Sequence, residues 1–159
     1  MSLDPSTFKS ALSLWASGVT VICYRSSHKS GGITVSSFSS VSLDPPLVLF
    51  CLAKGSQAKQ EIENSASFSV NILSSEQKQI SADFASSSLD KEEVLNLLKP
   101  TFSKLGLPFL PGALVNLDCK LHQLLDAGDH YLVLGEVREA QLGEGKPLLY
   151  FNRNYKDII

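Results

Sequence analysis

The sequence predicts a mainly β fold, an antiparallel barrel or sandwich with helices attached. Strand-like segments outnumber helix-like segments along the 159 residues, and they follow one another as meander-like neighbours. No regular alternation of strand and helix indicates a doubly wound sheet, and no Gly-x-Gly-x-x-Gly turn indicates a Rossmann nucleotide site. The length fits a single domain, 1–159.

The first predicted element is a helix over residues 6–16, capped by Ser6. Its apolar face carries Phe8, Leu12 and Trp15. A β-branched run, VTVICY, follows this helix and is typical of a strand.

The next strands are predicted over residues 34–41 and 47–53, with Val35 and Val41 facing the interior. A double proline lies between the two segments and excludes a central strand there. Three further helices are expected behind the N-caps Ser56, Ser75 and Asp90.

Apolar and polar residues alternate along 67–73 and 113–125, as in strands with two unlike faces. The second segment continues through the turn DAGDH into a hairpin over 113–142, and PLLYF forms a short final strand. The polar faces of the two alternating segments contain Ser69, Asn71, Asn116, Asp118 and His122.

Composition excludes several classes of protein. The net charge of −2 offers no basic field for nucleic acid or acidic membranes. The apolar runs are strand-length, well short of the ~20 residues of a membrane span, and the N-terminus lacks a signal-peptide pattern. The three cysteines and three histidines show no metal-ligand spacing, and reduced core thiols in a cytoplasmic protein are expected.

One segment carries the clearest chemical signal. Six hydroxyl residues lie among the nine residues 34–42, directly before an apolar strand. Since a buried hydroxyl without a partner costs roughly 1–3 kcal/mol, these groups need partners, either local backbone and solvent or a polar planar ligand. Lys54 and Ser56 follow that strand at a helix start, where a cation, a hydroxyl and free amides could bind a phosphate. Together they suggest a mononucleotide-type cofactor.

The segment GGITVSSFSSVSLDPPLVLFCLAKGSQ resembles the signature of the flavin reductase-like family, whose fold is an FMN-binding split barrel. FKSALSLWASGVTVI, FSVNILSSEQKQISADFA, GDHYLVLGEV and PLLYFNRNYKDI extend the resemblance over nearly the whole chain. The resemblance implies a six-stranded antiparallel Greek-key barrel with flanking helices, a homodimer, and flavin near the subunit interface.

The resemblance also implies roles for individual residues. The flavin would be held by ring-lining, phosphate-bordering and nearby residues, namely Thr34, Val35, Ser36, Ser37, Ser42, Cys51, Leu52, Ala53, Lys54, Ser56, Asn71 and Phe84. His130 would flank the nicotinamide, with Arg153 and Tyr155 at the rim. Relatives often carry arginine at position 54, and lysine keeps the charge without the bidentate fork.

The function expected from the resemblance is that of an NAD(P)H:flavin oxidoreductase that supplies reduced FMN or FAD to a partner monooxygenase. No catalytic side-chain acid or base is obligatory, because hydride transfer belongs to the two rings. Two alternatives remain open from the sequence: a flavin-holding electron carrier, and a non-enzymatic flavin- or haem-binding module on the same barrel.

Overall fold

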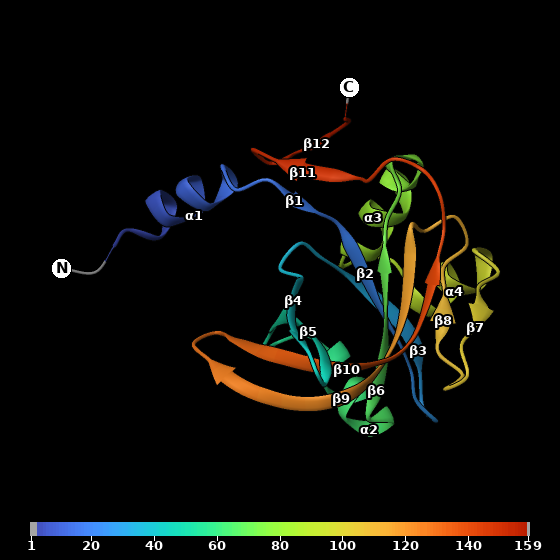
Figure 1. Cartoon of the computed structure of the whole chain (residues 1–159). Coiled ribbons are helices and arrows are strands. Elements are labelled where there is room, and N and C mark those ends of the chain that lie inside the picture. The colour runs from blue at the N-terminus through green and yellow to red at the C-terminus, as the bar shows by residue number, and fades with distance from the viewer. Residues whose placement is uncertain (1–2, 159) are drawn as a thin grey trace.

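The computed structural model describes residues 3–158 and is built around a seven-stranded antiparallel sheet (Figure 1). The strand order is β3-β2-β6-β9-β10-β5-β4. The strands are β2 (Thr20–Arg25), β3 (Ser30–Val35), β4 (Ser39–Leu43), β5 (Pro46–Ala53), β6 (Ser67–Ile72), β9 (Val115–Ala127) and β10 (His130–Leu142).

The order of the strands requires the sheet to curl. β3 and β4 are the two edges, yet only residues 36–38 connect them. Seven strands laid flat at ~4.8 Å spacing would separate the edges by roughly 29 Å. The four steps from Val35 to Ser39 reach roughly 14 Å at most. The sheet therefore forms a barrel that is open between β3 and β4.

Smaller elements surround the barrel. There are two small sheets. One has the order β1 (Ser17–Gly18), β11 (Leu149–Phe151), β12 (Asn154–Lys156), and the other pairs β7 (Thr101–Phe102) with β8 (Pro108–Phe109). The helices are α1 (Pro5–Ser13), α2 (Ala58–Ser65), the 3-10 turn η1 (Ser75–Gln77), α3 (Lys78–Ala85) and α4 (Lys91–Leu97).

The apolar run of β2 is explained by burial on both of its faces. Ile22 and Tyr24 point into the barrel and join the cluster that contains Phe50, Phe68 and Val133. Val21 and Cys23 point outward into a second cluster under α3 and α4, which contains Val19, Val21, Cys23, Leu73, Phe84, Leu95, Leu110 and Leu148. A strand without an exposed face needs apolar residues at every position.

The predicted N-caps at α1 and before α3 differ from the structure by one or two residues. Asp4 rather than Ser6 caps α1, because its carboxylate accepts from the Thr7 amide at 3.0 Å. Ser74 rather than Ser75 caps the turn before α3, where it forms a capping box with Gln77. The Asp90 cap is confirmed, since its side chain accepts from the Glu92 amide.

Val41 was expected inside but is 46% exposed. The ladder between β4 and β5 shifts its register between Ser40 and Ser42. Because an extra residue at a bulge reverses the inward and outward alternation, Val41 turns to solvent. Residues 36–38 separate β3 from β4, so the strand expected over 34–41 is divided and the sheet has seven strands.

Part of the polar face of β6 and β9 is buried, namely Ser69, Asn71, Asn116 and Asp118, whereas His122 on the same face is exposed. Ser69 donates to the Pro108 carbonyl at 2.6 Å, and the Asn71 side-chain oxygen accepts from the Leu110 amide at 2.9 Å. Asn116 donates to the Leu110 carbonyl at 3.2 Å. These side chains bind the backbone of the connector 100–111, which has little ladder pairing of its own.

Candidate functional site

The hydroxyl segment lies across the opening between β3 and β4. The Thr34 hydroxyl donates to the Ser81 carbonyl of α3 at 2.7 Å. The Ser37 hydroxyl accepts from the Cys51 amide at 2.9 Å and so fixes the 36–38 link to β5. Ser36 is exposed, Val35 is buried and Ser42 is half-buried. The local partners expected for the hydroxyls thus account for Thr34 and Ser37, while Ser36 stays open.

A cavity of about 190 Å³, here called the Ser36 cavity, opens beside this segment. It is lined by Val19, Thr34, Ser36, Ser81, Ala85, Tyr150 and Tyr155. The Tyr155 hydroxyl donates to the Ser81 hydroxyl at 2.8 Å, and the Tyr150 ring meets the Tyr155 ring edge-on at 5.7 Å. The fold therefore brings Tyr155 from the end of the chain to Thr34 and Ser36.

A second cavity of about 500 Å³, here called the Ser56 cavity, lies at the other end of β3. It is lined by Tyr24, Lys29, Gly32, Ile33, Ala53, Gly55, Ser56, Gln57, Ala58, Phe84, Ala85, Ser86, Ser87, Leu89, Asp90 and Lys91. Ala85 lines both cavities. Along β3, Gly32 and Ile33 face the Ser56 cavity, and Thr34 is the next residue along, in the Ser36 cavity.

Two glycines shape the Ser56 cavity. A Cβ on Gly32 would lie 3.0 Å from the Phe84 ring, so only glycine lets β3 pack closely against α3. A Cβ on Gly55 would have no heavy atom within 4 Å, so its backbone borders open space. The Ser36 cavity offers hydroxyls, while the Ser56 cavity offers two lysines and three serines. This donor set fits a polar ring joined to a phosphate.

Lys54 does not take the position expected for it. The side chain pairs with Asp126 at 2.7 Å and lies 5.4 Å from the Tyr131 ring centre. The hydrogen bond to Asp126 raises the pKa of Lys54. The Lys54 amide also donates to the Asp129 carbonyl at 3.0 Å, so the residue follows the β9–β10 hairpin and does not line the Ser56 cavity.

Of the other residues expected to border the phosphate, some line the Ser56 cavity and some do not. Ala53 and Ser56 line the Ser56 cavity. The Ser56 hydroxyl accepts from the Ala58 amide at 3.3 Å, although Gln57 is the N-cap of α2. Leu52 points into the barrel core, and Cys51 is half-buried behind Ser37.

His130 begins β10 directly opposite Ala53 in the ladder. Its Nδ1 lies 2.7 Å from the Asp129 carboxylate, and this hydrogen bond lowers the pKa of Asp129. Arg153 is exposed in the turn between β11 and β12. His130, Arg153 and Tyr155 thus do not share a cavity within one chain, over the residues described.

Of the two residues expected near the flavin, Phe84 lines a cavity and Asn71 does not. Phe84 is buried and lines the Ser56 cavity. Asn71 is fully buried in the polar layer under the connector, where its amide donates to the Val21 carbonyl at 3.0 Å. The structure does not bring Asn71 to either cavity, because Leu110 and Asn116 occupy its side-chain oxygen.

Replacing Asn71 with alanine is therefore expected to lower the free energy of unfolding by about 1–3 kcal/mol, because the Leu110 amide and Val21 carbonyl lose a buried partner. FMN affinity of the folded protein should change less than about threefold. Urea unfolding and flavin titration measure the two effects. The exposed Asn64→Ala variant is the control and should stay within about 0.5 kcal/mol. A large affinity loss at unchanged stability would place Asn71 in the site.

Several residues of the Ser56 cavity were not singled out from the sequence. They are Lys29 from the loop before β3, Ser86 and Ser87 from the segment between α3 and α4, and Lys91 at the start of α4. The available signal was the tract Ser86 to Ser88 just before the Asp90 cap, because polar residues at a helix start often border ligands.

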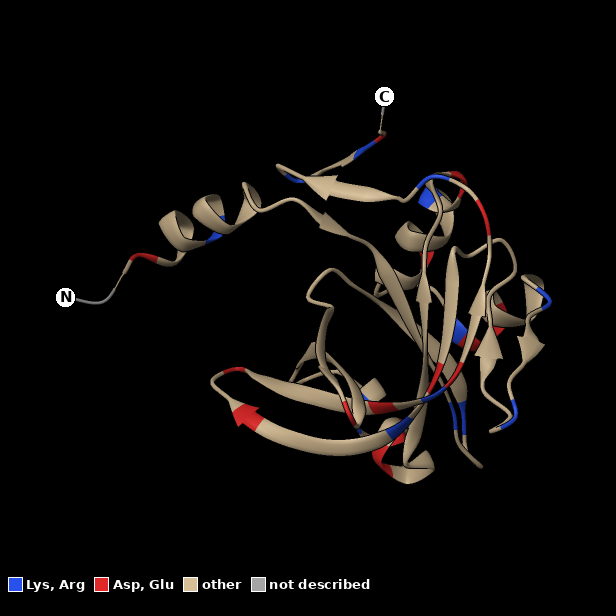
Figure 2. Cartoon of the chain, viewed as in Figure 1, with Lys and Arg blue, Asp and Glu red and all other residues tan. Residues whose placement is uncertain are grey.

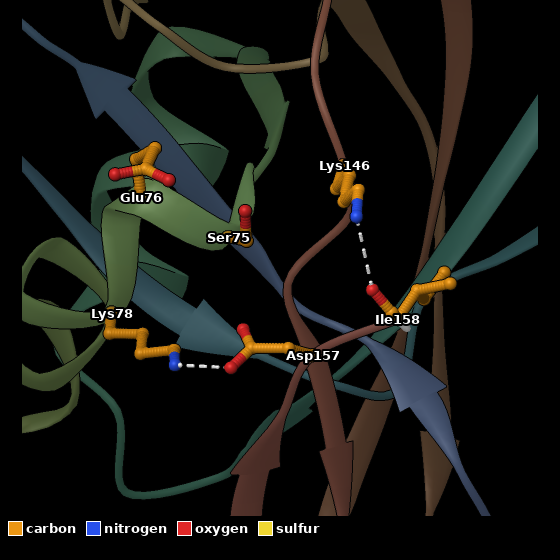
Figure 3. Close-up of a pocket in the computed structure, with 6 residues that line it drawn as sticks. All are labelled: Ser75, Glu76, Lys78, Lys146, Asp157 and Ile158. Atoms are coloured by element: carbon orange, nitrogen blue, oxygen red, sulfur yellow. Dashed lines mark hydrogen bonds and ion pairs between the residues drawn. The ribbon is translucent and has the colours of Figure 1, made fainter.

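Another hollow, of about 520 Å³, lies by the C-terminal segment (Figure 3). Lys78 pairs with Asp157 at 3.1 Å, and the Lys146 ammonium donates to the Ile158 carbonyl at 3.3 Å. The charges of its two lysines are balanced by those of Glu76 and Asp157, and none of the expected site residues lines it. Its contacts anchor the end of the chain that carries Tyr155.

Three further observations concern the cysteines, metal ligands and membrane-spanning helices. Cys23 and Cys119 are buried, and burial raises the pKa of each thiol to about 12. Over residues 3–158 no three His, Cys, Asp or Glu side chains gather as metal ligands. No helix in that range is long and apolar enough to cross a membrane.

Comparison with known proteins assigns the family. The family described as "Flavin reductase like domain" matches residues 12–158. The reductase subunit HsaB of a flavin-dependent monooxygenase from Mycobacterium tuberculosis is 39% identical over 98% of this chain and 83% of that protein. The reductase component of 4-hydroxyphenylacetate 3-monooxygenase from Thermus thermophilus is 37% identical over 96% of this chain and 95% of that protein.

Solved structures agree with the sequence relatives. The NADH:FAD oxidoreductase SgcE6 of Streptomyces globisporus, in complex with NAD and FAD fragments, superposes with a TM-score of 0.90 at 29% identity. The match covers 100% of this chain and 97% of that one. The chain belongs to the flavin reductase-like family.

Proposed function

We propose that this protein is an NAD(P)H-dependent flavin reductase whose reduced flavin diffuses to a partner monooxygenase in the cytoplasm. The observation that carries the proposal is the single strand β3, which borders an uncharged hydroxyl-lined cavity at one end and a lysine-lined cavity at the other. Its relatives named above include reductase components of two monooxygenases.

The Ser36 cavity is assigned to the flavin ring. Ser36 and Ser37 lie between two strands, so their backbone amides are outside the ladder. These amides are the candidate donors to the N1/C2 edge of the ring, where negative charge develops on reduction. The Ser37 bond to Cys51 holds the link rigid, so the donors need little reorganisation.

The protein's contribution is positioning. A bound flavin supplies the hydride-accepting ring, and the nicotinamide supplies the hydride. Tyr155, held by Ser81, borders the ring cavity and limits how a second ring enters it. His130 and Arg153 are assigned to the nicotinamide side with Tyr155. Holding two rings at roughly 3–3.5 Å is the geometry that hydride transfer requires.

A steady-state assay tests the function. NADH or NADPH oxidation is followed with added FMN, FAD and riboflavin, and turnover should require added flavin. Tightly bound flavin with slow NAD(P)H oxidation would support the electron-carrier alternative instead. A protein that binds no flavin at all would contradict the proposal.

We also propose that the protein is a homodimer, because α1 exposes its apolar face. No residue of α1 is buried, and the helix projects from the barrel with few charges (Figures 1 and 2). Phe8 is 52% exposed, Leu12 58% and the following Trp15 78%. A patch of this kind is typical of an interface. A second copy of the chain is the proposed occupant.

The expected sedimentation mass is therefore about twice the 17.2 kDa of one chain. Replacing Leu12 and Trp15 with serine should shift the protein toward monomer, since both side chains lose apolar area at the contact. The exposed Leu97→Ser variant, outside α1, is the control and should remain dimeric. A wild-type protein that is monomeric at micromolar concentration yet fully active would refute the dimer.

A further inference from the structure

The Ser56 cavity contains positive charge from an unexpected part of the chain. Its two cations are Lys29 and Lys91. Its one acid, Asp90, accepts from the Glu92 amide at 2.9 Å as a helix cap. Over residues 3–158 neither lysine lies within 4.0 Å of a carboxylate oxygen. The charge of this cavity is therefore not neutralised by a salt bridge.

Lys91 is the more firmly held of the two lysines. Its ammonium donates to the Asp83 carbonyl at 2.6 Å and also to the Ser86 carbonyl. Both acceptors lie at the end of α3, so Lys91 ties this end to the start of α4 and fixes the wall that includes Ser86. An ammonium has three donors, and two carbonyls leave one for a ligand. Lys91 is half-buried, and this partial burial lowers the pKa of its ammonium group.

The lysines that follow β5 are engaged elsewhere. Lys54 pairs with Asp126 and Lys59 with Glu63, each at 2.7 Å. Both ammonium groups lie over the Tyr131 ring, at 5.4 and 5.3 Å from its centre. Neither residue lines the Ser56 cavity. A phosphate in that cavity would meet Lys91 before it met Lys54.

We propose that Lys91 binds the phosphate of the flavin and makes the protein prefer phosphorylated flavins to riboflavin. This inference rests on the proposed function and names the cation of the same site. Ser56 lies in the same cavity and supplies a hydroxyl to the same group. Because Lys91 is half-buried, its ammonium gains more from an anion than a fully exposed lysine does, since the local dielectric is lower.

Flavin-fluorescence titrations with FMN and riboflavin test the proposal on four variants. Lys91→Met should weaken FMN binding about 10–100-fold and riboflavin binding less than about threefold, because one charge-assisted contact is lost. Lys91→Arg keeps the charge and should stay within about fivefold for both ligands. Lys54→Met, the matched control, should stay within about threefold for both. Thermal unfolding checks each variant, and Lys91→Gln, which keeps N–H donors for the carbonyls, replaces a methionine variant that fails to fold.

The possible results distinguish a failure of the Lys91 assignment from a failure of the proposed function. Loss of FMN affinity in Lys54→Met but not in Lys91→Met would overturn the assignment while leaving the reductase proposal intact. Equal weakening of FMN and riboflavin in Lys91→Met would overturn it too, since Lys91 would then only hold the wall. A wild-type protein that binds neither flavin would refute both the inference and the proposed function.

Discussion

Replacing His130 with alanine is expected to lower kcat/KM for NADH by about 10–100-fold, or about 1.4–2.7 kcal/mol of transition-state stabilisation. FMN affinity should change less than about threefold, because the two cavities along β3 are lined by other segments. Steady-state kinetics at saturating flavin and a flavin titration on the same variant measure both quantities.

The position of His130 supplies the reason. The residue starts β10 opposite Ala53, which lines the Ser56 cavity. Its side chain is 44% exposed and can reach a second ligand. The bond from Nδ1 to Asp129 fixes the orientation of the ring, so Nε2 is free to hydrogen-bond a nicotinamide carboxamide or phosphate.

Asp129→Asn is the graded control for His130. It should lower kcat/KM in the same direction but by less, since the imidazole remains and only its orientation is loosened. A His130→Ala variant with unchanged kinetics would make His130 an ordinary turn residue. Loss of FMN affinity with normal NADH kinetics would transfer His130 to the flavin side.

The predicted family, mainly β split-barrel class and flavin reductase function are confirmed by the relatives and solved structures. These predictions succeeded because their signals are local. Alternation along Phe68–Ile72 and the hairpin ending in Leu142 each depend on neighbours within one segment. Thr34 and Ser36 of the hydroxyl segment line the Ser36 cavity, and their role in flavin binding stays a prediction.

The side-chain partners could not be predicted, because they depend on distant segments. Lys54 turns from the cavity because Asp126, 72 residues later, reaches it at the hairpin tip. Lys91 enters the cavity because α4 folds onto β3, where the position of a Cβ on Gly31 is only 3.2 Å from the Lys91 Cβ. Neither contact leaves a pattern in a short window of sequence.

Burial of the polar face has a similar cause. Alternation in β6 and β9 correctly separated two faces, but alternation does not show whether the polar face meets water or protein. Ser69, Asn71 and Asp118 instead serve a connector with few backbone partners, and Asp118 accepts from the Leu105 amide at 3.2 Å. A sequence shows which residues can hydrogen-bond, whereas the tertiary fold decides whether water or protein provides the partner.

Replacing Phe68 with alanine is expected to lower the free energy of unfolding by about 3–5 kcal/mol, the usual range for truncating a buried aromatic side chain. Phe68 is fully buried inside the barrel and meets Phe50 edge-on, with ring centres 5.2 Å apart. Across the interior, a Cβ on Gly135 would lie 2.3 Å from the Phe68 ring, so the ring contacts the backbone of β10 directly. Urea unfolding at fixed protein concentration measures the loss.

A double-mutant cycle with Gly135 measures the contact between Phe68 and the backbone of β10. Gly135→Ala alone should destabilise the protein by about 1–3 kcal/mol, because the added methyl overpacks against Phe68. In the Phe68→Ala background the methyl enters the space left by the ring, so the same substitution should be neutral or stabilising. Phe102→Ala, at a 55% exposed ring, controls for aromatic truncation and should cost less than about 1 kcal/mol. Additive effects of the two substitutions would show that Phe68 and Gly135 are not in contact, and the tight packing of the barrel interior would then be wrong.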